Sequence, residues 1–167
     1  IKMNMFKLYI YSSICHLLFG ISNIIENKKF EVLNISHLVL ASSYYLRNEN
    51  ILEKQPITYS FISMIAHSII SVLSYHEKNY ILLIGQLGMI IHYIMELYIH
   101  YKYDYNLHSD LDSNPNWFYI YNILVYLLLF IAYGRQFITH KNNFWIALVI
   151  AYLLFGVYSI KFLKDKI

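Results

Sequence analysis

The chain has 167 residues, of which 58% are hydrophobic, with a mean hydropathy of +0.43 and a formal net charge of +3. Soluble domains hold roughly 45–50% apolar residues and interrupt them with polar positions at helical or strand period, so this composition excludes an ordinary soluble domain. The few Lys and Arg residues are spread among the loops, which excludes a nucleic-acid-binding patch. The single cysteine, Cys15, excludes an internal disulfide and a cysteine-ligated zinc or iron–sulfur site.

Six apolar segments, separated by short charged or polar clusters, predict six membrane-spanning helices. Runs near 18–20 residues match the ~30 Å of hydrocarbon that a helix crosses at 1.5 Å per residue. The fold class is therefore all-α, a polytopic integral membrane protein with about six transmembrane helices. In chain order, the expected helices are residues 8–25, 30–46, 57–75, 80–99, 117–133 and 144–162.

Short local patterns indicate where these segments begin and end. The charged run 26–29 (ENKK) closes the first segment, and Pro56 suits the start of the third, because a proline at the first helical position loses no hydrogen bond. Residues 102–116 form a long polar loop that ends in the turn-like run SNPN. The pair Gly134-Arg135 is the expected end of the fifth segment.

Polar side chains are concentrated in the first four segments. Because hydrocarbon offers no hydrogen-bond partner, polar groups at mid-depth must face protein or water. We therefore expect the first four helices to lie in a protein interface, and the last two to meet lipid or to pack on an outer face. The polar residues concerned are Asn23, Asn34, His37, His67, Gln86, His92 and Glu96, together with many serines.

His92, Glu96 and His100 are spaced four residues apart and share one helix face. Two of them could hold a metal ion, as His pairs at this spacing do, but no other segment plainly supplies a further ligand. The alternative is a Glu96 that is hydrogen-bonded inside a helix bundle. Glu96 is the only acidic residue deep in a membrane segment, so proton handling or ion pairing is its functional hypothesis.

His37 and His67 lie near the middle of the second and third segments. An imidazole that titrates near neutral pH can relay protons. The alternative is a structural hydrogen bond to a backbone carbonyl or to a serine hydroxyl, for which Ser36, Ser63 and Ser68 are near in sequence.

Three stretches, residues 18–29 (LFGISNIIENKK), 33–42 (LNISHLVLAS) and 63–73 (SMIAHSIISVL), share short motifs with a known family. Together they resemble the NuoK (4L-type) family, the small three-helix membrane subunit of respiratory complex I. Residues 18–25 (LFGISNII) and the charged turn 26–29 are similar to the LxGLxGLL-like end of the family's first helix and the turn after it. Residues 33–42 (LNISHLVLAS) fit the register of the second helix, LxxLIGLExxxxAxxL. Residues 63–73 (SMIAHSIISVL) are similar to the AAAEAxIGLALL pattern of the third helix.

The resemblance implies a three-helix segment over residues 1–78 and a three-helix extension over residues 79–167. It implies a non-redox core subunit of the membrane arm of mitochondrial NADH:ubiquinone oxidoreductase, with no redox centre and no cofactor of its own. The family's two intramembrane glutamates fall on His37 and His67. These two residues, with Glu96, are therefore the expected members of the polar axis that couples quinone reduction to proton translocation.

The composition adds an expectation about origin. Ile, Tyr, Asn and Lys, which A/T-rich codons specify, make up 69 of the 167 residues, and the chain begins with Ile1. With the resemblance, this predicts a multi-pass protein of the mitochondrial inner membrane, encoded in the organelle of an A/T-rich protist. Its expected partners are lipid and the other membrane subunits of a large respiratory complex, and no nucleic acid. Two alternatives stay open: a structural subunit of another inner-membrane complex, such as ATP synthase or an oxidase, and a stand-alone intramembrane enzyme or carrier.

Overall fold

The computed structural model describes residues 5–27, 31–48, 56–103, 115–140 and 144–165, and nearly all of these are helical, with no strand among them. The all-α prediction is therefore confirmed. The six helices are α1 (Met5–Asn27), α2 (Val32–Asn48), α3 (Pro56–His76), α4 (Tyr80–Tyr103), α5 (Asn116–His140) and α6 (Trp145–Asp165).

By length and composition, five of the six helices can cross a membrane. The exception is α2, which has 17 residues and an apolar part, Val32–Leu46, that is shorter than the others. At 1.5 Å per residue a 17-residue helix is about 25 Å long, which is at the lower limit for a membrane span. The chain is an integral membrane protein by this measure, with α2 as its shortest helix.

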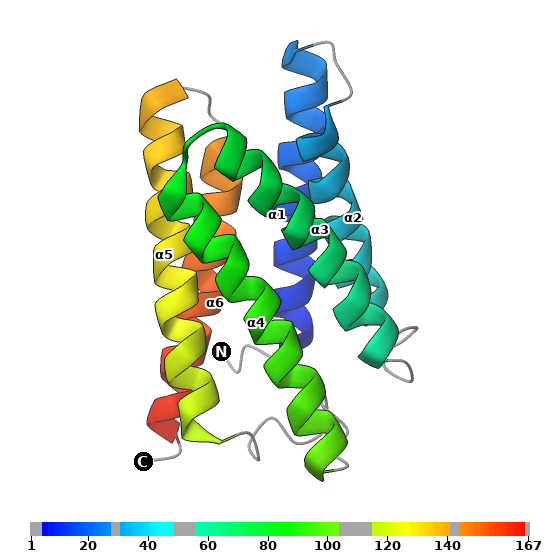
Figure 1. Cartoon of the computed structure of the whole chain (residues 1–167), viewed down its shortest axis with the longest axis vertical. Coiled ribbons are helices and arrows are strands. Elements are labelled where there is room, and N and C mark those ends of the chain that lie inside the picture. The colour runs from blue at the N-terminus through cyan, green and yellow to red at the C-terminus, as the bar shows by residue number, and fades with distance from the viewer. Residues whose placement is uncertain (1–4, 28–30, 49–55, 104–114, 141–143, 166–167) are drawn as a thin grey trace.

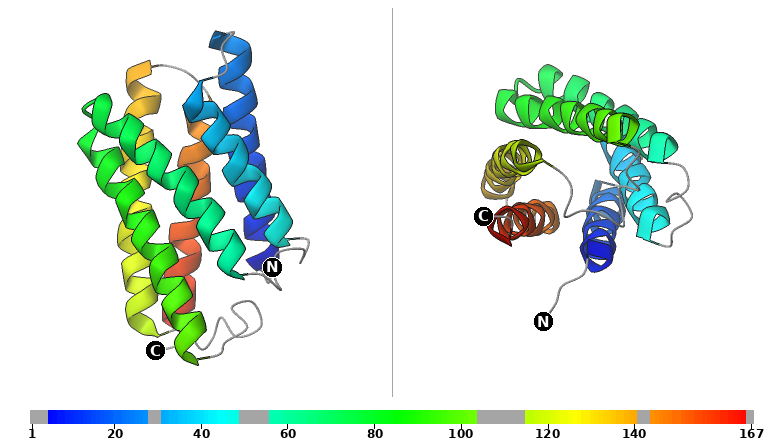
Figure 2. Two further views of the ribbon diagram at one scale, coloured as in Figure 1. Left: turned by 45° about the vertical axis from the view of Figure 1, so that its right-hand side comes forward. Right: turned by 90° about the horizontal axis from the view of Figure 1, so that it is seen from below.

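The helices form a closed ring of three antiparallel hairpins, α1–α2, α3–α4 and α5–α6 (Figure 1). Each helix packs against the next one in the sequence, and α6 packs against α1. The end-on view in Figure 2 shows the three hairpins around a common axis. Because the number of helices is even, α1 begins and α6 ends at the same end of the ring.

The last two helices are full members of this ring, so the expectation that they pack on an outer face is wrong. Asn122 and Tyr133 on α5 and Tyr152 on α6 are buried inside the ring, like the polar residues of the first four helices. The prediction failed because tyrosine places a hydroxyl in the interior, while its ring keeps the helix apolar in composition. The outer surface of the ring consists largely of exposed aliphatic and aromatic side chains, such as Ile84 and Leu124.

Helix α5 continues through Gly134-Arg135 to His140, which is beyond the end that the sequence predicts. A glycine inside a helix costs only about 1 kcal/mol, so it does not end a helix unaided. A side chain at Gly134 would meet no atom within 4 Å, so no packing requirement selects glycine at this position.

Two other glycines of the ring permit a close approach of α4 and α5. A Cβ at Gly85 would lie 2.7 Å from Leu129 Cδ2, and one at Gly88 would lie 2.9 Å from Val125 Cγ2. The close approach of α4 and α5 also brings the Tyr121 hydroxyl to the carbonyl of Gly88, to which it donates at 2.8 Å. Glycine therefore sets the distance between these two helices, as small residues do in membrane helix packing.

A three-residue turn joins α3 to α4. The amide of Asn79 donates to the carbonyl of Ser74, and the amide of Lys78 donates to that of Tyr75, which is the Schellman pattern of a helix end. Lys78 occupies the left-handed position of this motif with φ 57°. Asn79 also starts α4, because its side-chain oxygen accepts from the amide of Leu82. The boundary between the two predicted domains falls at this turn, and both sides of it contribute to one ring.

Candidate functional site

Three fully buried histidines from three helices lie inside the ring, and we call them the histidine core: His16, His37 and His67. The rings of His16 and His37 stack with centroids 5.1 Å apart, and their Nδ1 atoms are separated by 2.9 Å. One Nδ1 must donate and the other must accept, so the neutral pair consists of opposite tautomers. His67 is on α3, which packs against α2, the helix of His37.

The second ring nitrogen of each core histidine has no hydrogen-bond partner within the described part of the chain. This holds for the buried Nε2 atoms of His16, His37 and His67, and also for the hydroxyls of Ser12 and Ser63. Each serine lies four residues before a core histidine on the same helix face. An unpaired buried polar atom costs about 1–3 kcal/mol, so five of them on adjoining helix faces require an explanation beyond stability.

A chain of side-chain hydrogen bonds extends from His67 across two hairpins. His67 Nδ1 lies 2.5 Å from Gln86 Oε1, and Gln86 Nε2 donates to the Tyr133 hydroxyl at 2.8 Å. Because an amide oxygen only accepts, His67 has its proton on Nδ1 and a lone pair on Nε2. The Tyr133 ring lies 6.1 Å from that of His37, so the series of side-chain contacts returns to α2.

Three tyrosines adjoin the histidine core, and we call them the tyrosine cluster: Tyr44, Tyr59 and Tyr93. The Tyr93 hydroxyl lies 3.2 Å from that of Tyr44 and 3.4 Å from that of Tyr59. The Tyr93 ring stacks on His67 at 5.7 Å, and the Tyr44 ring lies 5.4 Å from that of His16. The tyrosine cluster therefore contacts the histidine core at His67 and at His16.

Beyond the tyrosine cluster lies a cavity of about 50 Å³, to which all six helices contribute and which we call the Glu96 cavity. Glu96 is 4% exposed and accepts a hydrogen bond from the Ser60 hydroxyl at 3.3 Å. His92 and Asn122 also line the cavity, with His92 Nδ1 2.6 Å from Asn122 Oδ1. A water needs roughly 10–15 Å³ by this kind of measure, so the cavity holds a few waters or a small molecule. It lies toward the end of the ring where α1 begins and α6 ends.

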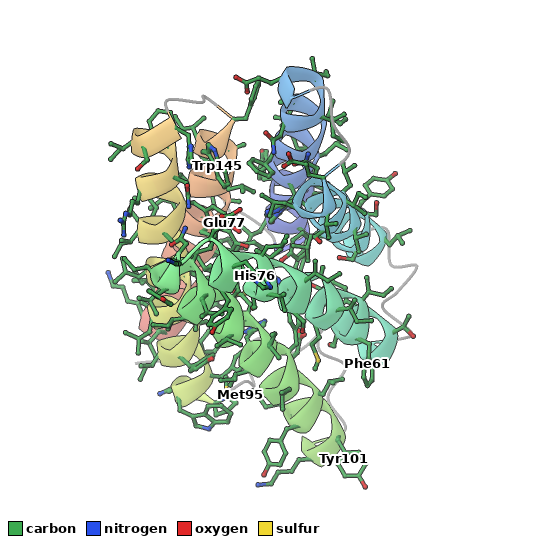
Figure 3. All side chains as sticks on the ribbon, turned by 45° about the horizontal axis from the view of Figure 1, so that its top comes forward. Phe61, His76, Glu77, Met95, Tyr101 and Trp145 are labelled. Atoms are coloured by element: carbon green, nitrogen blue, oxygen red, sulfur yellow. The ribbon has the colours of Figure 1, made fainter. Side chains whose placement is uncertain are left out.

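Aromatic rings close the other side of the histidine core. Phe19 lies 4.6 Å from His37 and 4.7 Å from Trp145, measured between ring centroids. Trp145 lines a second, more open cavity with Glu26, Glu77 and other polar residues, and Figure 3 shows Glu77 and Trp145 toward this end, with Tyr101 at the far end of α4. The histidine core therefore lies between two cavities, with the Phe19 and Trp145 rings on the side of the second one.

The three proton-path candidates predicted from the sequence, His37, His67 and Glu96, are all buried. His37 and His67 point away from the outer surface, on helices that pack against each other, and Glu96 faces its cavity. Among the described residues, neither imidazole bonds to a serine hydroxyl or a backbone carbonyl, and their partners are His16 and Gln86.

The side chain of His100 lies outside the described residues, so the face that it would share with Glu96 and His92 stays a prediction. In the described ranges, no group of three or more His, Cys, Asp or Glu side chains is placed to hold a metal ion.

Sequence reasoning missed His16 and the interior tyrosines. His16 and Asn23 are seven residues apart, which places them on one face of α1. The structure uses that face against α2, where Asn23 Nδ2 donates to Asn34 Oδ1 at 2.5 Å. Tyr126 and Tyr133 are also seven residues apart, so their spacing indicates in the same way that they share one face of α5.

No protein-family model matches the chain, and no curated protein and no solved structure matches it. The side chains inside the ring are therefore the basis for assigning a function.

Proposed function

We propose that the chain is a membrane subunit that transfers protons along a polar path inside its own helix ring. The path consists of Glu96, the tyrosine cluster, His67 and the His16–His37 pair. The observation that supports it is the presence of three fully buried imidazoles next to hydroxyls that reach a cavity with a buried carboxylate. The Nε2 of each imidazole has no hydrogen-bond partner among the residues that the structure describes. Ionisable groups at this depth in a membrane are typical of proton pathways.

His67 is arranged to gain and lose a proton on Nε2. Its Nδ1–H is held by Gln86 Oε1, and Tyr133 binds the amide nitrogen of Gln86, so the amide orientation is fixed. When Nε2 gains a proton, the Gln86 oxygen remains in place as a hydrogen-bond acceptor for the imidazolium. The ring can then return to the neutral form by releasing a proton from Nε2.

The tyrosine cluster would connect His67 to the Glu96 cavity. A hydroxyl both donates and accepts, so a row of hydroxyls can pass a proton along. The two separations, 3.2 and 3.4 Å, exceed the 2.7–2.8 Å of a typical O–H···O bond. Transfer therefore requires the tyrosines to approach one another by a few tenths of an ångström.

For the assembly in which this path works, we propose the membrane arm of complex I in the mitochondrial inner membrane. The support is the resemblance of residues 18–73 to the NuoK family, with His37 and His67 at the positions of the family's glutamates. The ring covers these histidines with its own helices, so burial alone does not require a partner, and a partner would bind the apolar outer surface. Gentle purification from the native membrane tests this proposal. Recovery with NADH-oxidising subunits supports it, and recovery with rotary ATPase subunits favours the structural alternative.

Proton flux into proteoliposomes tests the path itself. His67→Gln and His37→Gln retain hydrogen-bonding capacity but remove the titrating group, so each should lower the flux at least tenfold. His76→Gln is the matched control, because His76 is an exposed histidine at the end of α3 and should leave the flux unchanged. Circular dichroism checks that the variants keep their helices. Wild-type flux in a folded His67→Gln protein would overturn the path.

A further inference from the structure

Two polar cavities adjoin each other at the end of the ring where α3 ends and α4 begins. One is the second cavity described above, which we now call the acidic cavity; it has about 350 Å³, and its lining includes Glu26, Glu31 and Glu77. The other, which we call the Arg135 cleft, has about 380 Å³ and is lined by residues 77–79 of the α3–α4 turn and by Arg135, Gln136, Thr139 and His140 of α5. Glu77, Gln136 and His140 line both cavities, so the two form one polar surface.

This polar surface has positive charge on one side and negative charge on the other. Lys78 on the turn and Arg135 on α5 are exposed and line the Arg135 cleft, while three carboxylates line the acidic cavity. Helix α4 begins beside the cleft, and the positive end of its dipole also favours an anion there. Among the residues that the structure describes, Glu77 forms no ion pair with Lys78 or Arg135. The opposite charges are therefore held apart, and a ligand with charges of both signs is complementary to them.

The two cavities lie at the depth of the membrane surface. Tyr75 and Tyr80 flank the α3–α4 turn and are 61% and 57% exposed, and exposed tyrosines are typical of the boundary between hydrocarbon and water. One helical turn deeper, the exposed side chains of Ile84 on α4 and Ile131 on α5 form apolar surface. Ile131 precedes Arg135 by four residues, so the two lie on the same face of α5. A lipid with its headgroup in the cleft would thus have apolar helix surface beside its acyl chains.

We propose that these two cavities together bind the headgroup of a bilayer lipid that has a phosphate and a primary ammonium group, as phosphatidylethanolamine has. The Arg135 guanidinium and the Lys78 ammonium bind the phosphate, for which arginine offers several N–H donors in a fixed geometry. The lipid ammonium donates its N–H groups to Glu77 and the neighbouring carboxylates. Basic pockets between transmembrane helices bind lipid headgroups, and a cavity volume above roughly 300 Å³ is typical of a site for a small ligand.

The charges of the site select among lipids. Phosphatidylcholine has the same phosphate, but its methylated nitrogen has no N–H to donate to a carboxylate. Phosphatidylglycerol has the phosphate without a positive group, so the carboxylates of the acidic cavity repel it. This inference goes beyond the proton path, because the site lies at the surface of the ring and uses none of the residues of the path.

Native mass spectrometry of the full chain, titrated with each lipid in detergent, tests the site. We expect dioleoyl phosphatidylethanolamine to bind the wild type about tenfold more tightly than the choline and glycerol lipids with the same chains, since a charge-assisted hydrogen bond is lost in each case. Arg135→Gln and Glu77→Gln should each weaken binding of the ethanolamine lipid about tenfold for the same reason. Lys161→Gln is the matched control, because Lys161 is an exposed cation near the end of α6, at the opposite end of the ring, and should leave the binding unchanged.

A fourth ligand separates the bilayer lipid from a soluble source of the same headgroup. Glycerophosphoethanolamine lacks acyl chains and should bind at least tenfold more weakly than the lipid. Equal binding of this compound would overturn the assignment to a lipid, and so would equal binding of the choline or the glycerol lipid. Wild-type affinity in a folded Arg135→Gln protein, or equal weakening by Lys161→Gln, would overturn the location of the site. The comparison of ligands on the wild type stays decisive even where a variant folds poorly, and the flux of His67→Gln judges the proton path separately.

Discussion

His16 and His37 direct the same ring nitrogen, Nδ1, at each other across the interface of α1 and α2, with 2.9 Å between the two atoms. A neutral imidazole has one N–H and one lone pair, so a short contact between like atoms fixes the protonation of both rings together. A change of tautomer in one histidine therefore forces the opposite change in the other.

This contact predicts the tautomers of the histidine core. In solid-state ¹⁵N spectra of the histidine-labelled protein in bilayers, His16 and His37 should give one Nδ1–H ring and one Nε2–H ring. His67 should be an Nδ1–H tautomer, because Gln86 Oε1 accepts from it. Substitution of each histidine in turn assigns the signals. Spectra in which all three rings have the proton on Nε2 would contradict this arrangement.

The contact between Gln86 and Tyr133 should contribute a small, measurable coupling energy. Side-chain hydrogen bonds between membrane helices average about 0.6 kcal/mol in double-mutant cycles. We expect about that value for Gln86→Leu and Tyr133→Phe, measured by unfolding in mixed detergent micelles. Tyr121→Phe with Gln86→Leu is the control cycle, because the Tyr121 hydroxyl donates to the carbonyl of Gly88, and its coupling should be near zero.

Glycines in the ring should respond to alanine in opposite ways. Gly85→Ala and Gly88→Ala place a methyl group against Leu129 and Val125, and should each destabilise the fold by about 1–3 kcal/mol. Gly134→Ala adds its methyl group in open space and should stabilise α5 by about 0.5–1 kcal/mol. Thermal unfolding of the three variants separates these effects. Similar stabilisation by all three would mean that helix propensity, and not the approach of α4 to α5, determines the result.

The turn between α3 and α4 offers a stabilising substitution. Lys78 has φ 57°, a conformation that costs a residue with a Cβ roughly 1–2 kcal/mol. Lys78→Gly should recover about 1 kcal/mol of this in the free energy of unfolding. Glu77→Gly is the neighbouring control and should give no gain, because Glu77 has no such strain. Equal stabilities of Lys78→Gly and the wild type would show that the turn tolerates the lysine without strain.

The helices of this protein can be predicted from the sequence because apolar length alone determines a membrane span. The interior face of each helix is harder to predict. In lipid, an apolar side chain is stable both in the protein interior and on the outer surface. The difference between polar and apolar faces, which orients a helix in water, therefore gives little information here. The polar residues of a helix still indicate its interior face, and on this basis His37, His67 and Glu96 are correctly predicted to be buried.

The partners of these residues could not be predicted in the same way. His37 pairs with His16 from 21 positions earlier, and Gln86 bonds to Tyr133 from 47 positions later. Such contacts depend on the order of helices around the ring. The contact of α6 with α1 sets that order, and it joins the two ends of the chain, where no local pattern in the sequence indicates a neighbour.

The contact between α6 and α1 also constrains how the protein is made. During insertion α1 reaches the bilayer first, and its histidine and asparagine can be covered by α2 as soon as that helix follows. Gln86 and His92 on α4, however, each have a hydrogen-bond partner on α5, and the ring has an open side until the final helix arrives. A ribosome that stalls after α4 would therefore leave polar groups of α4 facing acyl chains, which offer them no hydrogen-bond partner.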